Sequence, residues 1–174
     1  MIKVTDKPKE QYQKESPQTV FTKALTIGFS GGILWSGIGA LTYFFHFSEV
    51  SAASFLIRSY LQNDWSGTWL AEILAIIGVG LLSLVTAMLY YFTLKRQSGI
   101  WPGAVFGIIL WGLVFVVLTP LFPAIPTFME LTSDTWVTTG CLFILYGVFI
   151  GYSISYEFQE FNQPSNSYSK EQGV

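Results

Sequence analysis

Charged residues are scarce in this chain of 174 residues: only 11% are Asp, Glu, Lys or Arg, whereas 51% are hydrophobic. Soluble globular domains carry about 25% charged residues. Eleven acidic and nine basic residues leave a net charge of −2, which provides no basic surface for nucleic acid. The composition therefore excludes an ordinary soluble domain, gives no sign of a nucleic-acid partner, and indicates an integral membrane protein.

Cysteine and histidine are almost absent, with one residue of each. Cys141 has no partner for an intramolecular disulfide, and one thiol cannot build a cysteine-based metal site. The sequence also lacks a phosphate-binding loop, a Ser-His-Asp set and paired carboxylates at membrane depth. We therefore expect no enzyme activity, no cofactor and no resident metal.

Long charge-free runs are the dominant feature that is present. Residues 24–48, 73–94, 97–129 and 135–156 contain no Asp, Glu, Lys or Arg. An α-helix needs about 20 residues to cross a hydrocarbon core of about 30 Å, so each run can form a span. Three prolines, at 120, 123 and 126, are expected to end the third helix early. We predict an all-α, four-transmembrane-helix bundle with spans over about 20–46, 69–94, 101–121 and 135–157.

Both ends of the chain are polar and are expected to lie outside the membrane. We predict a disordered tail over 1–18, a membrane domain over 19–158 and a mobile tail over 159–174. Four spans place both termini on one side, and eight of the nine basic residues fall on that side, against Arg58 on the other. The positive-inside rule then predicts that both termini are cytoplasmic.

The first external connection has helical periodicity. Apolar residues at 53, 56, 57, 60 and 61 would share one face of a helix, and Ser54, Arg58 and Gln62 the other. We predict a short amphipathic helix over about 50–62, lying on the outer leaflet or folded over the bundle mouth. Basic and aromatic residues near the expected membrane boundaries are predicted to be interface anchors: Lys23, Trp65, Trp69, Trp101 and Trp136.

Small residues recur at every fourth position in three spans. Helices in lipid are not driven together by the hydrophobic effect, so small residues that allow close backbone approach favour their packing. We favour contacts within one chain over a homodimer seam, because a four-helix bundle already has interfaces to fill. These helix-packing stripes comprise Gly28, Gly32, Ser36 and Ala40, then Gly103 and Gly107, and finally Gly147, Gly151 and Ser155.

Trp35 and Trp111 lie near mid-membrane in matching Gly-x-Ile-Leu-Trp segments. The match hints at a two-plus-two duplication, as in some transporters, and a buried indole N–H needs an acceptor. We favour a packing role over a ligand contact for both residues. The charge-free runs at the centres of the spans contain no carboxylate, lysine or arginine, which ion-coupled transporters usually need.

Five acidic residues, which fall in the external connections, could in principle bind a divalent cation through oxygen ligands. Their spacing matches no loop motif, so we favour solvated surface acids. The five are Glu49, Asp64, Glu72, Glu130 and Asp134.

Three segments together carry a family resemblance: Gly31-Gly-Ile-Leu-Trp-Ser36, Gly99-Ile-Trp-Pro-Gly103 and Ile144-Leu-Tyr-Gly-Val-Phe-Ile-Gly-Tyr-Ser-Ile-Ser-Tyr-Glu157. The chain resembles the YqhR family of small bacterial membrane proteins over roughly 23–157. The resemblance implies a multi-pass protein of the bacterial plasma membrane. The family has no assigned function, so the resemblance transfers no catalytic residues.

Two function hypotheses follow. The preferred one is a structural or interaction component, an accessory protein whose partners are the lipid bilayer and another copy of itself or another membrane protein. The alternative is a small-solute transporter or channel. A polar cavity reaching Ser36, Thr86 or Thr139 would favour transport, whereas tight packing with an exposed groove along Gly147 and Gly151 would favour association.

Overall fold

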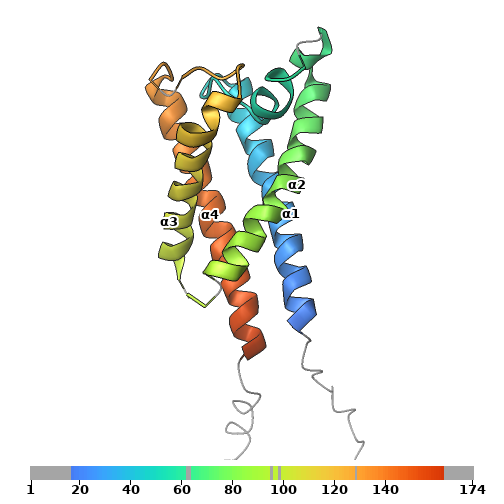
Figure 1. Cartoon of the computed structure of the whole chain (residues 1–174), viewed down its shortest axis with the longest axis vertical. Coiled ribbons are helices and arrows are strands. Elements are labelled where there is room, and N and C mark those ends of the chain that lie inside the picture. The colour runs from blue at the N-terminus through green and yellow to red at the C-terminus, as the bar shows by residue number, and fades with distance from the viewer. Residues whose placement is uncertain (1–16, 62–63, 95, 98, 128, 163–174) are drawn as a thin grey trace, which may run out of the picture.

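Four long helices run side by side in the computed structural model of the protein, which describes residues 17–61, 64–94, 96–97, 99–127 and 129–162 (Figure 1). The long helices are α1 (Pro17–Phe44), α2 (Trp69–Thr93), α3 (Ile100–Gly112) and α4 (Ser133–Asn162). The third continues through a π-helical segment, η3 (Leu113–Leu118), and a 3-10 turn, η4 (Thr119–Leu121). No strand occurs in these ranges, which confirms the all-α class.

Four segments are long and apolar enough to cross a membrane: Val20–Phe44, Trp69–Thr93, Ile100–Leu121 and Ser133–Gln159. The predicted four-span membrane class is therefore confirmed. Of the expected tails, 1–18 and 159–174, only 17–18 and 159–162 fall in the described residues, where they are helical, and the rest lies outside them.

The first helix ends in a hydrogen-bonded cap. The N–H of Phe47 donates to the carbonyl of Thr42 (2.9 Å) and the N–H of His46 to that of Tyr43 (3.0 Å). His46 has a φ of 63°, the left-handed conformation that usually belongs to glycine in this Schellman motif. The chain therefore turns sharply back over the bundle after α1.

The helices pack as two pairs. The contacts of α1 with α2 and of α3 with α4 are the most extensive, and α1 also packs against α4, whereas α2 and α3 are not close neighbours along the described residues. The start of α1 and the end of α4 lie at one end of the bundle. The other end, here called the capped end, carries η1 (Ser54–Arg58), η2 (Asp64–Gly67) and η4 (Figure 1).

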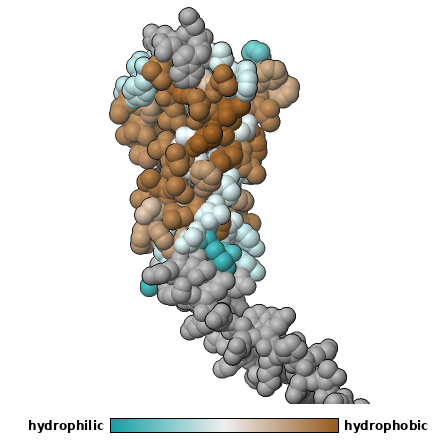
Figure 2. Space-filling view, turned by 90° about the vertical axis from the view of Figure 1, so that its right-hand side faces the viewer, coloured by the Kyte–Doolittle hydropathy of each residue, from teal (hydrophilic) through white to brown (hydrophobic). Residues whose placement is uncertain are grey.

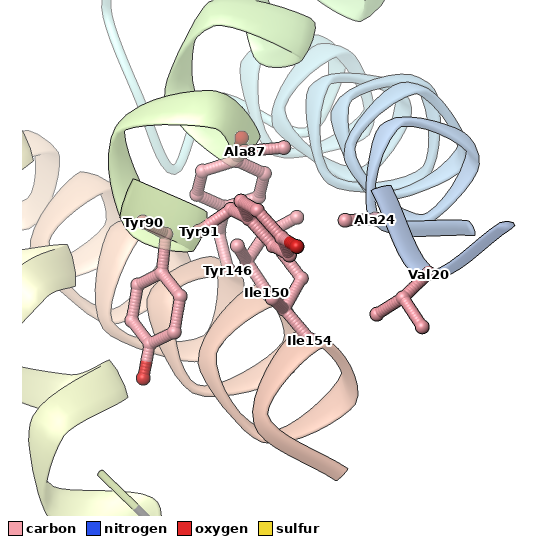
Figure 3. Packing of buried hydrophobic residues seen from close by; sticks show 8 residues of the cluster. All are labelled: Val20, Ala24, Ala87, Tyr90, Tyr91, Tyr146, Ile150 and Ile154. Atoms are coloured by element: carbon pink, nitrogen blue, oxygen red, sulfur yellow. The ribbon is translucent and has the colours of Figure 1, made fainter. Parts of the chain in front are cut away.

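The largest buried cluster joins α1, α2 and α4 (Figure 3). Smaller clusters lie at the capped end, where Ala53 and Ile57 pack against Ala71 and Ala75 of α2. The face of the bundle in Figure 2 is hydrophobic over most of its height, and α2 leaves many large apolar side chains exposed. Such a surface suits lipid rather than water.

The predicted amphipathic helix over 50–62 is not confirmed. The segment forms one π-helical turn, Ser54–Arg58, with buried residues on both predicted faces: Ile57 is 8% exposed and Ser54 only 4%. The helical periodicity was real, but Arg58 bonds to Ser66 and Glu72 instead of facing solvent. The segment therefore packs against the start of α2 as a cap.

Candidate functional site: a membrane-facing cavity

A cavity of about 270 Å³ lies between the two helix pairs, in the half of the bundle nearer the capped end. All four helices contribute to its walls. The lining includes Trp35, Ser36 and Gly39 of α1, Val79, Leu82 and Thr86 of α2, Leu110 and Val114 of the third span, and Thr139, Leu142 and Phe143 of α4.

The floor of the cavity is a hydrogen-bonded contact among three helices. The Ser83 hydroxyl donates to the carbonyl of Gly28, so the Tyr146 hydroxyl donates to Ser83. Tyr146 also belongs to the main buried cluster, which fills the bundle beyond this point. The cavity is therefore closed toward the end that carries the start of α1.

The ceiling is built by the capping segment. Phe55 lies edge-on to Phe115 and Phe122, with ring centroids 5.5 and 5.3 Å apart. The Tyr60 hydroxyl donates to the carbonyl of Leu121 (3.1 Å). These contacts tie the α1–α2 connection to the end of the third span, and they cover the cavity at the capped end.

The mouth of the cavity lies at its side. Both α2 and the third span line the space, but α2 and α3 are not close neighbours, whereas α1 packs against α2 and α4. Leu82 of α2 lines the cavity and is 55% exposed. The opening is therefore lateral, between α2 and α3, onto the membrane-facing surface.

The interior is apolar despite several hydroxyl groups in the lining. Ser36 donates to the carbonyl of Gly32 (2.6 Å), Thr42 to Gly39 (2.8 Å) and Thr139 to Thr135 (2.6 Å), all within their own helices. No lining residue carries a charge. The cavity therefore offers little to a polar solute.

The size of the cavity, about 270 Å³, bears on what it can hold. An engineered apolar cavity of about 150 Å³ in another protein already takes up benzene. The space is therefore large enough for an apolar guest.

The predicted packing glycines lie inside the two helix pairs. A Cβ built on Gly32 would lie 2.5 Å from the Cβ of Ser83 on α2, and one on Gly103 would lie 2.6 Å from the carbonyl oxygen of Gly147 on α4. Gly147 and Gly151 are buried against α3, so the groove that would have favoured association is not exposed along them.

The remaining stripe residues are similarly placed. Gly28 faces Ala87 of α2, and Gly107 faces the carbonyl of Phe143 on α4. Ser155 is 2% exposed, while Ser36 lines the cavity and Ala40 is half-buried. The glycines of these stripes hold each pair together closely.

The two mid-span tryptophans have different surroundings. The indole N–H of Trp111 donates to the Thr139 hydroxyl (3.1 Å), and its ring stacks on Phe115 with centroids 5.6 Å apart. Trp35 lines the cavity, and its buried Nε1 has no hydrogen-bond partner among the described residues. Only Trp35 of the two can therefore touch a guest.

The predicted anchors lie near both ends of the spans. Trp69 and Trp101 are 69% and 83% exposed, and Trp136 is half-buried, 5.9 Å from the ring of Trp111. Lys23 forms an ion pair with Glu157 (3.0 Å). The side chain of Trp65 is outside the described part of the chain.

A polar network beside the ceiling was missed by the sequence reasoning. The Arg58 Nη2 donates to Glu72 Oε1 (2.7 Å), and the Ser51 hydroxyl donates to the same oxygen (2.7 Å). The guanidinium also lies 4.8 Å from the ring centroid of Tyr43. The sequence did contain one sign of this network: Arg58 is the lone basic residue on its side of the membrane. A cation that is partly buried there needs a carboxylate as its partner.

The acids of the interhelical connections form no metal site within the described residues. No group of three or more His, Cys, Asp or Glu could hold a metal ion within the ranges that the structure describes. Glu72 pairs with Arg58, Glu49 accepts the N–H of Thr132 (3.4 Å), and Glu130 accepts that of Thr127 (3.0 Å). Asp134 is exposed, and the side chain of Asp64 is not described.

Four membrane-crossing helices, two close-packed pairs and a lateral apolar cavity define a small multi-pass membrane protein. A family model described as conserved membrane protein YqhR matches residues 5–169. The chain is also similar to a protein of Bacillus subtilis (strain 168) described as uncharacterized protein YqhR, with 41% identity over 161 residues, 92% of this chain and 90% of that protein. The chain belongs to the YqhR family of bacterial membrane proteins. No solved structure matches it.

Proposed function

We propose that this protein is a non-catalytic accessory component of the bacterial plasma membrane, with both termini in the cytoplasm, that binds another membrane component within the bilayer. The observation that carries the proposal is the lateral, apolar cavity between α2 and α3. An uncharged space that opens to lipid suits a guest that arrives through the membrane rather than from water.

The alternative function is transport of a small polar solute. Its support is that Ser36, Thr86 and Thr139 line the cavity. A polar solute needs hydrogen-bonding groups to replace its water. The Ser36 and Thr139 hydroxyls already donate within their own helices, and the Thr86 hydroxyl is 3.5 Å from the Leu82 carbonyl. Binding is therefore the better supported function.

Association through the glycine stripes has less support than binding in the cavity. A stripe can join a second copy only where it faces outward. Gly103, Gly107, Gly147 and Gly151 face one another inside the α3/α4 pair. The proposed partner therefore meets the cavity mouth and not these stripes.

A cavity-filling variant tests the proposal. Gly39 lines the cavity, and a Cβ there would meet only Leu142 Cδ1 at 3.9 Å, so Gly39→Leu extends into free space. Gly37→Leu is the matched control, because it adds the same side chain to the same helix where a Cβ meets nothing within 4 Å. The full chain is isolated from its own membrane in native nanodiscs and examined by native mass spectrometry.

We expect the wild-type protein and Gly37→Leu to retain a bound membrane component. Gly39→Leu is expected to lose it. Equal retention by all three proteins, or none by any of them, would contradict the proposal. Vesicles containing the wild-type protein are expected to show the same solute flux as empty vesicles. A flux that Gly39→Leu abolishes would support the transporter instead.

A further inference from the structure

We propose that the cavity binds one hydrocarbon chain of a membrane lipid, which enters sideways between α2 and α3 beside Leu82. This inference rests on the proposed function and names its ligand.

The mouth opens at the depth of lipid chains. Leu82 is thirteen residues after Trp69, where α2 begins, which corresponds to about 20 Å along the helix. A hydrocarbon core is about 30 Å thick, so this point lies well inside it. Neighbouring exposed residues of α2, Leu81 and Val85, extend the same apolar surface away from the mouth. Headgroups do not reach this level, whereas acyl chains surround it.

Closure at both ends selects a guest that terminates inside the bilayer. The Ser83–Tyr146 contact forms the floor, and Phe55 packed against Phe122 forms the ceiling. A transmembrane helix of a partner passes through the whole hydrocarbon layer and cannot stop between these two contacts. A lipid chain ends within the layer and can enter from the side.

The chemistry of the walls suits an uncharged hydrocarbon. The lining contains no charged residue, and aliphatic and aromatic side chains such as Val79, Leu110 and Phe143 face the space. Ser36 and Thr139 donate to carbonyls of their own helices. A saturated chain loses no hydrogen bonds on entering such a space, whereas a polar guest would leave its water-bonding groups unsatisfied.

Trp35 provides a reporter for the experiment because its ring lines the cavity. The full chain is reconstituted into phosphatidylglycerol vesicles whose acyl chains carry bromine near their middle, and into matched vesicles without bromine. Bromine quenches indole fluorescence on contact. The quenched fraction of tryptophan emission is measured for wild type, Gly39→Leu, Gly37→Leu, Trp35→Phe and the double variant Trp35→Phe/Gly39→Leu.

Filling the cavity is expected to relieve the quenching of Trp35 alone. Because the chain has six tryptophans, Gly39→Leu should recover up to about one sixth of the emission relative to wild type and Gly37→Leu. In the Trp35→Phe background, Gly39→Leu should have no effect. Circular dichroism of every variant establishes that it is folded.

Equal quenching of folded wild type and Gly39→Leu would overturn the inference. If the native mass spectra still show a component that Gly39→Leu loses, the proposed binding function stands and its ligand is not a lipid chain. If both experiments show no effect of Gly39→Leu, the binding function itself fails.

Discussion

Trp35 and Trp111 occupy matching sequence segments, yet their indole N–H groups have different surroundings. Trp111 donates to Thr139, which lies on a different helix, while the Nε1 of Trp35 is buried without a partner in the described ranges. A local pattern could place both residues at mid-membrane depth. It could not distinguish them, because the neighbouring helix supplies or withholds the acceptor.

Replacing Trp111 by Phe is expected to lower the unfolding free energy by about 1 kcal/mol more than replacing Trp35 by Phe. Both changes remove part of an indole ring, but only the first removes a hydrogen bond, whose net value is about 1 kcal/mol. The measurement is chemical unfolding in mild detergent. A larger loss for Trp35→Phe would mean that the Trp111–Thr139 bond is not a stabilising contact.

Replacing Arg58 by Ala is expected to destabilise the protein by about 3 kcal/mol, because it leaves the largely buried Glu72 carboxylate without its cation. The double variant Arg58→Met/Glu72→Leu should recover most of this loss, since no unpaired charge remains. Arg96→Ala, at an exposed position, is the control. The measurement is the unfolding free energy in mild detergent. If Arg58→Ala left it unchanged, the pairing of Arg58 with Glu72 would be contradicted.

At the scale of the elements, the spans could be predicted because membrane crossing needs only length and the absence of charge. The capping segment could not be predicted, because Ser54 is buried and accepts a bond from Arg58 within the turn, while Arg58 also bonds to Ser66 outside it. Helical periodicity assigns such residues to a solvated face. Their burial depends on Ser51 and Glu72, which meet only in the folded chain.

The close contact of α3 with α4 predicts opposite effects at two glycines of the third span. Gly107→Ala would push a methyl group against the carbonyl of Phe143 and is expected to lower the unfolding free energy by about 1–3 kcal/mol. Gly112→Ala meets nothing within 4 Å and should be neutral or stabilising, since alanine favours a helix over glycine. Thermal unfolding checks both, and equal effects would argue against the close contact.

At the scale of the whole molecule, the cavity exists because α1 joins the two helix pairs through α4 while α2 and α3 remain apart. Helix contacts could be inferred from stripes such as Gly103 and Gly107. The separation of α2 from α3 could not, because it depends on how the pairs lean against each other and on the ceiling at Phe55. No repeating pattern of residues encodes such a space.

The proposed orientation predicts which surface labels reach. In a Cys141→Ser background, Met129→Cys is expected to react with a membrane-impermeant maleimide in intact cells. Met129 is 90% exposed and lies in the connection between η4 and α4, which is at the capped end (Figure 1). Arg96→Cys, between α2 and α3 at the opposite end, should react only after the cells are opened. The reverse pattern would show that both termini lie outside.

The most direct test of the account is the lipid dependence of the unfolding midpoint for wild type, Gly39→Leu and Gly37→Leu. A ligand that binds only the folded state raises stability. Returning lipid to delipidated protein should raise the midpoint of wild type and Gly37→Leu, and raise that of Gly39→Leu much less, because leucine already occupies the cavity. An equal rise for all three proteins would contradict the claim that the cavity between α2 and α3 holds a membrane component.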